Sequence, residues 1–107
     1  MLHGCAVEAF ALPPEKRFHR FLCLEEGDLV APAPRSERYT IVEVSMFAGR
    51  SVEAKKRFYA LLFERFEREL GIGPDDLEVL VVETPRHDWA IRGLPGDELQ
   101  VGYRVEV

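Results

Sequence analysis

The sequence predicts an α+β fold made of strand–helix–strand units. Two observations carry this prediction. Residues 51–70 place apolar side chains three and four positions apart, as one face of a helix requires, and a strand pattern stands on each side, at residues 38–47 and 77–82. One helix between two strands returns the chain in the same direction, so we expect a parallel pair joined by a right-handed crossover.

The helix at residues 51–70 has recognisable start and stop signals. Ser51 is a good N-cap, and Glu53 suits the positive end of the helix dipole. Gly71 stands just after the last apolar position, where helices often end in a left-handed residue. The apolar stripe consists of Ala54, Phe58, Leu61, Leu62 and Leu70.

The two flanking segments differ in their pattern. Residues 38–47 alternate, with one face more apolar than the other, which is typical of a half-buried strand. Residues 77–82 are almost continuously apolar and follow a turn at residues 74–76. A continuous apolar run suits a strand within a covered sheet.

The first forty residues resemble the end of another such unit. Residues 6–10 suit the last turn or two of a helix, and residues 17–24 suit a strand. Segments 11–16 and 71–76, which lie 60 positions apart, share one pattern: a small residue, an aliphatic residue, a linker position, a proline and then polar residues. The same offset puts the counterpart of strand 38–47 upstream of Met1. We therefore expect one domain, 1–107, with residues 1–37 as a remnant of the first unit plus a proline-containing linker. Residues 38–107 then hold the second unit, terminal turns and a short strand at 102–107.

Composition excludes several classes of protein. The net charge is −5 and the isoelectric point about 5.2, which argues against a nucleic-acid partner. No apolar run approaches the roughly 20 residues that cross a bilayer, and no secretory signal is visible, so no membrane partner is expected. Cys5 and Cys23 suit reduced thiols in a cytoplasmic protein. The three histidines lack metal-ligand spacing and no phosphate-binding glycine motif occurs, so we expect no metal and no cofactor.

Four residues are candidates for a binding site, each with an ordinary structural alternative. Arg50 precedes a helix start, where a guanidinium and backbone N–H groups favour a carboxylate, although it could be a solvated loop arginine. Trp89 could line a pocket or fill core or an interface. Arg92 could bind an anion or be an exposed loop residue. Arg17 could be a second substrate-side cation or a charge that protects an edge strand.

Four segments together resemble the tautomerase superfamily, in particular its fused members of the 4-oxalocrotonate tautomerase and malonate semialdehyde decarboxylase type. They are Phe-Ala-Gly-Arg-Ser at 47–51, the turn at 71–76, the valine-rich strand to Glu83, and Asp-Trp-Ala-Ile-Arg-Gly at 88–93. The specific motifs lie within residues 38–98. The resemblance implies a four-stranded sheet per fused protomer, two helices on one face, and usually a homotrimer.

The resemblance also implies a kind of chemistry. In this superfamily an amino-terminal proline of low pKa acts as base or acid, arginines bind the substrate carboxylate, and an aromatic residue lines the pocket. Arg50 matches the arginine of the Gly-Arg-Ser motif and Trp89 matches the pocket aromatic. This chain begins Met1-Leu2, and Leu2 should keep Met1 in place. Internal prolines such as Pro13 are amides without basicity, so the catalytic proline is missing from these 107 residues.

Two functions remain open at this point. The first is proton transfer alpha to a carbonyl in a small 2-oxo or unsaturated carboxylic acid, provided that an upstream amino-terminal proline exists. The second is a non-catalytic oligomer that keeps the fold and a small-anion pocket. For either, we expect self-association, most simply as a trimer and next as a dimer, because an edge strand would otherwise leave its backbone groups unpaired.

Overall fold

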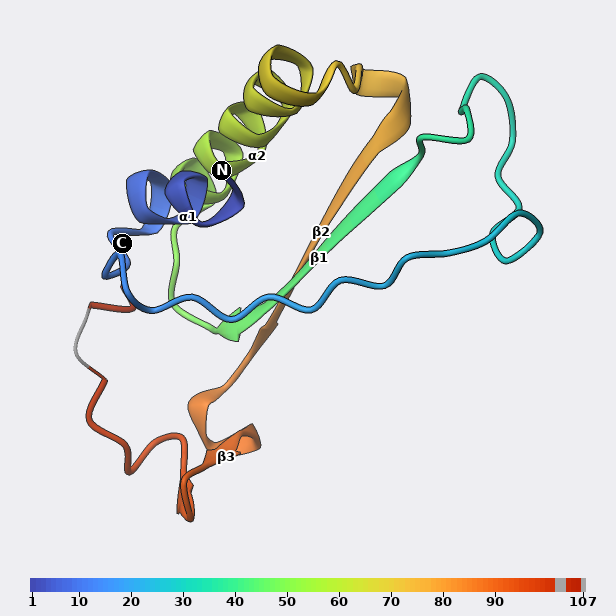
Figure 1. The fold of residues 1–107 in the computed structure, drawn as a ribbon. Helices are drawn as coiled ribbons and strands as arrows, with labels where there is room; N and C mark the ends of the chain where they lie inside the picture. The colour runs from blue at the N-terminus through green and yellow to red at the C-terminus, as the bar shows by residue number, and fades with distance from the viewer. Residues whose placement is uncertain (102–103, 107) are drawn as a thin grey trace.

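The computed structural model describes residues 1–101 and 104–106, and two helices lie on the same side of a two-stranded sheet (Figure 1). Helix α1 spans Leu2–Phe10 and helix α2 spans Val52–Arg65. Strands β1, Thr40–Phe47, and β2, Leu77–Thr84, form the sheet. The helices on one face and the mixed α+β class agree with the sequence prediction.

Strands β1 and β2 pair in parallel along their whole length. Thr40 lies opposite Leu77 at one end of the ladder, and Phe47 lies opposite Thr84 at the other. Helix α2 connects the two strands, so residues 38–84 form the strand–helix–strand unit that the sequence predicts.

Helix α2 begins and ends where its sequence signals indicate. The Ser51 side chain accepts a hydrogen bond from the backbone N–H of Ala54, with N···O 3.1 Å. The helix continues into a π-helical turn at Phe66–Leu70, which sequence periodicity does not reveal. Gly71 then adopts φ +67°, a conformation that costs a glycine little. A short 3₁₀ turn at Pro74–Asp76 leads into β2.

The core lies between the two helices and the sheet. The α2 side contributes Phe58 and Leu62, and the next turn contributes Phe66. Helix α1 contributes three buried residues and the strands contribute two; these are Cys5, Ala9, Phe10, Met46 and Leu77. The ring centroids of Phe10 and Phe58 lie 5.0 Å apart, so α1 is packed directly on α2.

The expected strand at residues 17–24 does not form. The segment is extended but belongs to no sheet, and its side chains are in solvent, with Phe18 88 % and Leu22 78 % exposed. A strand needs a neighbour for its backbone N–H and C=O groups, and among the described residues no neighbouring strand is bonded to this segment. The parallel sheet therefore has two strands in place of the four that the resemblance implies.

After β2 the chain forms a compact turn structure. A 3₁₀ turn at Arg86–Asp88 precedes a small antiparallel hairpin of β3, Ala90–Ile91, and β4, Leu94–Pro95. The terminal strand predicted at 102–107 falls partly on residues 102, 103 and 107, which lie outside the described residues; residues 104–106 are in no strand. Within the described ranges, none of the helices has the length and apolarity needed to cross a membrane.

Candidate functional site

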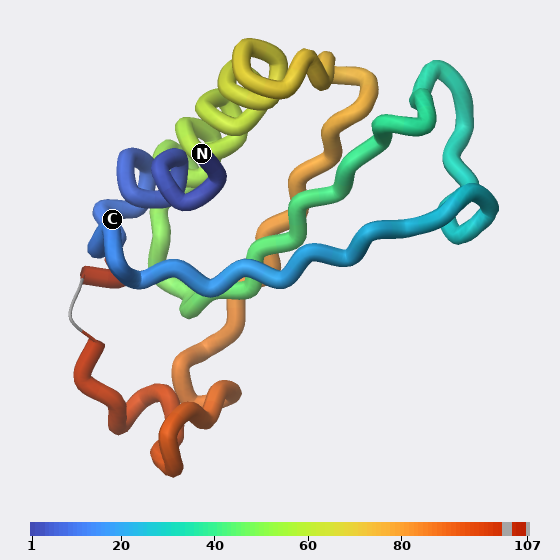
Figure 2. The backbone as a smooth tube through the Cα atoms, viewed as in Figure 1, coloured from blue at the N-terminus to red at the C-terminus, as the bar shows by residue number. Residues whose placement is uncertain are grey.

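A groove of about 1100 Å³ runs along β1 and collects the predicted site residues. One wall is β1 over its full length, the other is the extended segment at residues 16–23, and α1 contributes lining residues as well. Figure 2 shows this segment crossing near the end of β1 and then diverging from it. Arg17, Arg50, Trp89 and Arg92 all line this groove, although they come from three separate parts of the chain.

Arg50 lies in the loop between β1 and α2. Its side chain is 7 % exposed, and its Nη1 donates to the carbonyl oxygen of Phe47 with N···O 2.9 Å. The guanidinium carbon lies 5.6 Å from the centroid of the Phe10 ring, in cation–π range. These two contacts fix the Arg50 guanidinium next to the first turn of α2, where backbone N–H groups also favour an anion.

The loop that carries Arg50 is fixed from β2. Gly49 adopts φ +134°, and its backbone N–H donates to Glu83 Oε2 with N···O 3.1 Å. A side chain at Gly49 would also meet Val105 Cγ1 at 3.1 Å, so glycine fits both the conformation and the space. The Lys55 ammonium forms an ion pair with Glu83. This interaction, followed by the Gly49 hydrogen bond, holds the pKa of Glu83 below its usual range.

Sequence reasoning missed Lys55 and Glu83 as positioning residues for Arg50. The available signal was a carboxylate, Glu83, directly after the continuous apolar run at residues 79–82. Because β1 and β2 are parallel, Glu83 lies opposite Met46, close to where β1 gives way to the Arg50 loop.

Trp89 is half-buried and stands against the end of β1. Its ring meets the Phe47 ring edge-on, with centroids 5.3 Å apart and an interplanar angle of 78°. Arg86, which sequence reasoning also missed, holds this region together. Its Nε donates to the carbonyl oxygen of Gly96 (2.9 Å) and its Nη2 to that of Leu99 (2.6 Å), and its guanidinium carbon lies 5.3 Å from the Phe47 centroid.

Arg17 and Arg92 are exposed at the groove, in contrast to Arg50. Arg92 adopts φ +53° in the hairpin loop. The groove has five lysine or arginine residues against one carboxylate, Glu43, in a chain of net charge −5; the basic residues are Lys16, Arg17, Arg20, Arg50 and Arg92. Such a local excess of positive charge attracts small anions.

His3 and His19 also line the groove, with ring centroids 6.2 Å apart. Burial, followed by the charge of Arg17, lowers the pKa of His19, which favours the neutral ring at pH 7. Across residues 1–101 and 104–106, no cluster of three or more histidine, cysteine or carboxylate side chains could hold a metal ion.

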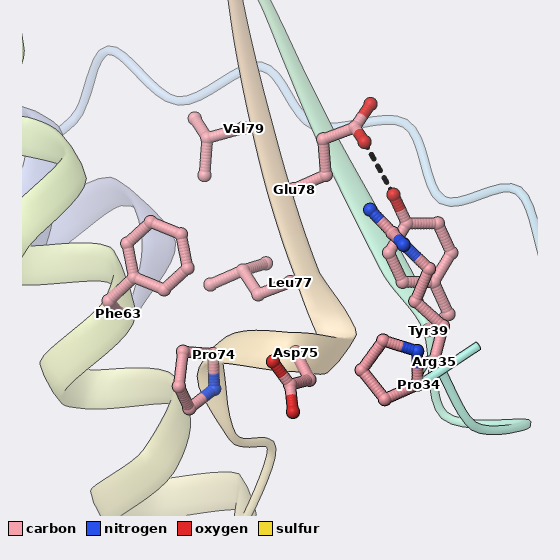
Figure 3. Close-up of a pocket in the computed structure, with 9 residues that line it drawn as sticks. All are labelled: Pro34, Arg35, Tyr39, Phe63, Pro74, Asp75, Leu77, Glu78 and Val79. Carbon is pink, nitrogen blue, oxygen red and sulfur yellow. Dashed lines mark hydrogen bonds between the residues drawn. The ribbon is translucent and has the colours of Figure 1, made fainter. Parts of the chain in front are cut away.

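A smaller pocket of about 400 Å³ lies at the opposite end of the sheet, near the starts of β1 and β2 (Figure 3). It contains none of the four predicted site residues. The Tyr39 hydroxyl donates to the Glu78 carboxylate there, and the Arg35 guanidinium carbon lies 5.4 Å from the Tyr39 ring centroid. Because these polar groups already interact with each other, the groove along β1 is the better candidate site.

The fold and groove define a strand–helix–strand α+β protein whose candidate site lies where the parallel strands end. Comparison with known proteins then gives the family. A family model described as "Tautomerase enzyme" matches residues 16–92. The probable tautomerase YrdN of Bacillus subtilis (strain 168) is 32 % identical over 93 residues, covering 82 % of this chain and 71 % of that protein.

Two solved structures of malonate semialdehyde decarboxylases are also similar to this chain. This chain is similar to FG41 malonate semialdehyde decarboxylase inhibited by 3-bromopropiolate, with a TM-score of 0.74 and 30 % identity over 83 % of this chain and 71 % of that one. It is also similar to a second malonate semialdehyde decarboxylase, with a TM-score of 0.63 and 35 % identity over 84 % of this chain and 73 % of that one. The chain belongs to the tautomerase family.

Proposed function

We propose that this chain forms the substrate-binding part of a tautomerase-family enzyme that acts on a small 2-oxo or unsaturated carboxylic acid. The observation that carries the proposal is the placement of Arg50 and Trp89 on one cationic groove at the start of α2. A buried guanidinium beside a helix N-terminus suits a carboxylate, and a neighbouring indole excludes water from it.

Each site residue has a distinct part in this proposal. Arg50 binds the substrate carboxylate through its planar fork of N–H donors. Trp89 covers the bound acid, with its ring oriented by Phe47. Arg17 and Arg92 add positive charge at the exposed side of the groove, where they attract the anion and bind a second polar group.

The reaction is proton transfer alpha to a carbonyl, and it depends on an amino-terminal proline ahead of these residues. The secondary amine of that proline takes a proton from one position of the substrate and returns it to another, so that no atoms are gained or lost. The cationic groove stabilises the carboxylate and the enolate charge that develops between the two steps.

A second candidate is a non-catalytic oligomer with a small-anion pocket. It rests on the same buried guanidinium of Arg50 beside the start of α2, which suits a small anion whether or not chemistry follows. Both candidates share the carboxylate site. For either we propose a single-domain cytoplasmic protein, in line with the free thiols of Cys5 and Cys23, which assembles as a trimer.

Carboxylate binding is tested by titrating the protein with a small dicarboxylate and following Trp89 fluorescence. We expect saturable binding that Arg50→Ala weakens by about 1.5–3 kcal/mol, the range for a hydrogen bond to a charged group. Arg68→Ala is the matched control, since Arg68 is exposed on the π-helical turn and pairs with Glu64 away from the groove. Equal binding by the Arg50 and Arg68 variants would remove Arg50 from the site.

Catalysis is tested separately, with a form of the protein whose first residue is proline. We expect turnover of 2-hydroxymuconate that is lost when that proline is replaced by alanine and reduced when Arg50 is replaced. Carboxylate binding without turnover in the proline-bearing form would favour the non-catalytic candidate.

A further inference from the structure

Part of the groove along β1 is lined by a segment with little regular structure. This end segment, residues 85–101, follows β2 and lies beyond the end of β1, on the side away from the helices (Figure 1). Its regular structure is confined to the 3₁₀ turn at Arg86–Asp88 and the short β3–β4 hairpin. Five of its residues line the groove: Trp89, Ile91, Arg92, Leu99 and Val101. The contacts that hold the end segment together therefore also shape the groove beside Trp89.

Arg86 holds the two halves of the end segment together. Its Nε donates to the carbonyl oxygen of Gly96 and its Nη2 to that of Leu99, ten and thirteen residues further along the chain. Both donors belong to one planar guanidinium, so the two carbonyl groups are fixed relative to each other. Because Leu99 lines the groove, one of these bonds acts directly on the groove wall.

Gly96 links Arg86 to the main chain of Trp89. The Gly96 N–H donates to the carbonyl oxygen of Trp89, while the Gly96 carbonyl oxygen accepts from Arg86. The close approach requires a residue without a side chain. A Cβ at this position would collide with the carbonyl oxygen of Arg86 and would meet that of Trp89 at 3.1 Å. The Arg86 guanidinium therefore restrains the main chain of Trp89 through this one glycine.

Arg86 also reaches the aromatic ring that orients Trp89. Its guanidinium carbon lies 5.3 Å from the centroid of the buried Phe47 ring, in cation–π range, and the Trp89 ring meets the same Phe47 ring edge-on. The Phe47 carbonyl oxygen in turn accepts from Arg50 Nη1. Phe47 thus contacts the two arginines and the indole, although Arg86 is not among the described residues that line the groove.

We propose that Arg86 is a positioning residue for Trp89, and that it acts on an acid bound at Arg50 only through the Trp89 indole. It restrains the main chain of Trp89 through Gly96 and the ring through Phe47. An indole that is already in place loses less conformational freedom when a ligand binds, which strengthens binding. The effect on a bound acid rests on the proposed function, whereas the hold on Trp89 does not depend on it.

The hold on Trp89 is measured in the protein without ligand. Trp89 is the only tryptophan of the sequence, so the fluorescence reports on this one indole. Arg86→Met keeps a long aliphatic side chain but loses the charge and every N–H donor. We expect its emission to shift to longer wavelength and its quenching by acrylamide to rise, because water reaches an indole that is no longer held. Emission and quenching equal to those of the parent chain would overturn the proposal.

Two further variants separate this effect from a general loss of structure, with every spectrum taken below the midpoint of thermal unfolding. Arg35→Met is the matched control, since the Arg35 guanidinium also lies over an aromatic ring, that of Tyr39, but at the opposite end of the sheet. It should keep the emission of the parent chain, and a shift as large as that of Arg86→Met would overturn the proposal.

Arg86→Lys is the conservative variant. It keeps a cation that can lie over the Phe47 ring and donate to one carbonyl group, so its emission should fall between those of the parent chain and Arg86→Met. If Arg86→Met fails to fold, Arg86→Lys decides the question: a partial shift supports the proposal, and emission equal to that of the parent chain overturns it.

Action through Trp89 is measured with succinate, by calorimetry, in a double-mutant cycle. We expect Arg86→Met to weaken succinate binding at least about fivefold in the parent chain, and less than about twofold when Trp89 is already replaced by alanine. A residue that merely supported the fold would weaken binding by the same factor in both backgrounds. Equal factors would therefore overturn the part of the proposal that assigns the effect to Trp89.

The two measurements keep this inference apart from the proposed function. If the parent chain bound no succinate while Arg86→Met still shifted the emission, the proposed function and the effect on a bound acid would be overturned, and the hold of Arg86 on Trp89 would stand. If succinate binding depended on Arg50 while Arg86→Met changed neither the emission nor the affinity, the proposed function would stand and the role of Arg86 would be overturned.

Discussion

Lys55 and Glu83 form an ion pair that ties the first turn of α2 to the end of β2. The same carboxylate accepts the N–H of Gly49, one residue before Arg50. Both side chains are about four-fifths buried, so solvent screens the pair less than a surface salt bridge. Glu83 thus holds the loop that presents the buried guanidinium to the groove, and its protonation state couples to the stability of that loop.

We expect this coupling in the pH dependence of folding. The pKa of Glu83 is lower in the folded protein than in the unfolded chain, so Glu83 contributes stability above the ordinary glutamate pKa of about 4.3. That contribution is lost as the pH falls through the lowered, folded-state value. Urea unfolding between pH 7 and pH 3 should show a smaller acid-induced loss for Glu83→Gln than for the parent chain.

Glu26→Gln is the control for this measurement, because Glu26 is exposed in the linker before β1. It should follow the parent chain at every pH. If Glu83→Gln and Glu26→Gln gave the same profile, the ion pair with Lys55 would contribute nothing to folding.

The core predicts a clear contrast between two leucines near the same helix face. Leu62 is fully buried in α2, and Leu62→Ala should lower the free energy of unfolding by about 2–5 kcal/mol, because it leaves a cavity among packed side chains. Leu70 is 47 % exposed at the end of the π-helical turn, so Leu70→Ala should cost less than about 1.5 kcal/mol. Denaturant titration of both variants measures the difference, and similar losses would contradict the packing described for Leu62.

The 107-residue chain should show little proline-type tautomerase activity. Its first residue is Met1, whose α-amine is primary, and internal prolines such as Pro13 are amides. Phenylenolpyruvate turnover at pH 7 is the measurement. A rate close to that of proline-bearing relatives, abolished when the α-amine is blocked, would contradict this prediction.

The sequence predicted the local elements well and the sheet less well. Ser51, Gly71 and the apolar period located α2, and the apolar run at residues 77–82 located β2, because these signals lie within the segments themselves. Residues 17–24 have strand-like composition but no strand, because pairing depends on a neighbour that composition does not report. The π-helical turn and the β3–β4 hairpin were also missed.

In the candidate site, too, the sequence predicted individual residues better than the contacts between distant segments. The motif arginine Arg50 and the single tryptophan Trp89 were predictable, and the structure places both at one groove. Glu83, Lys55 and Arg86 were not, since each acts through contacts between segments that are distant in sequence. Whether the four predicted residues bind substrate stays a prediction.

Self-association is the last prediction, and it follows from the sheet face that the helices leave uncovered. Val42 and Val79 pack toward the core, so the alternating residues Ile41, Leu80 and Val82 face the other way and are 40–48 % exposed. Glu43, Ser45 and Glu78 share this face, so it is apolar in part. We expect it to be buried in a closed trimer, with a dimer next, because a second copy would cover its exposed aliphatic side chains and closed symmetry is common among soluble oligomers. For the parent chain, light scattering at micromolar concentration should give the mass of three chains, or next of two, where one chain is 12.2 kDa.

Leu80→Lys should shift that mass toward one chain, because it puts a charge in place of the most exposed of these three aliphatic side chains. Val52→Lys is the matched control, since Val52 is 58 % exposed at the start of α2 and away from the sheet. A parent chain that stays at 12.2 kDa would contradict the prediction and leave the uncovered face as a property of the monomer.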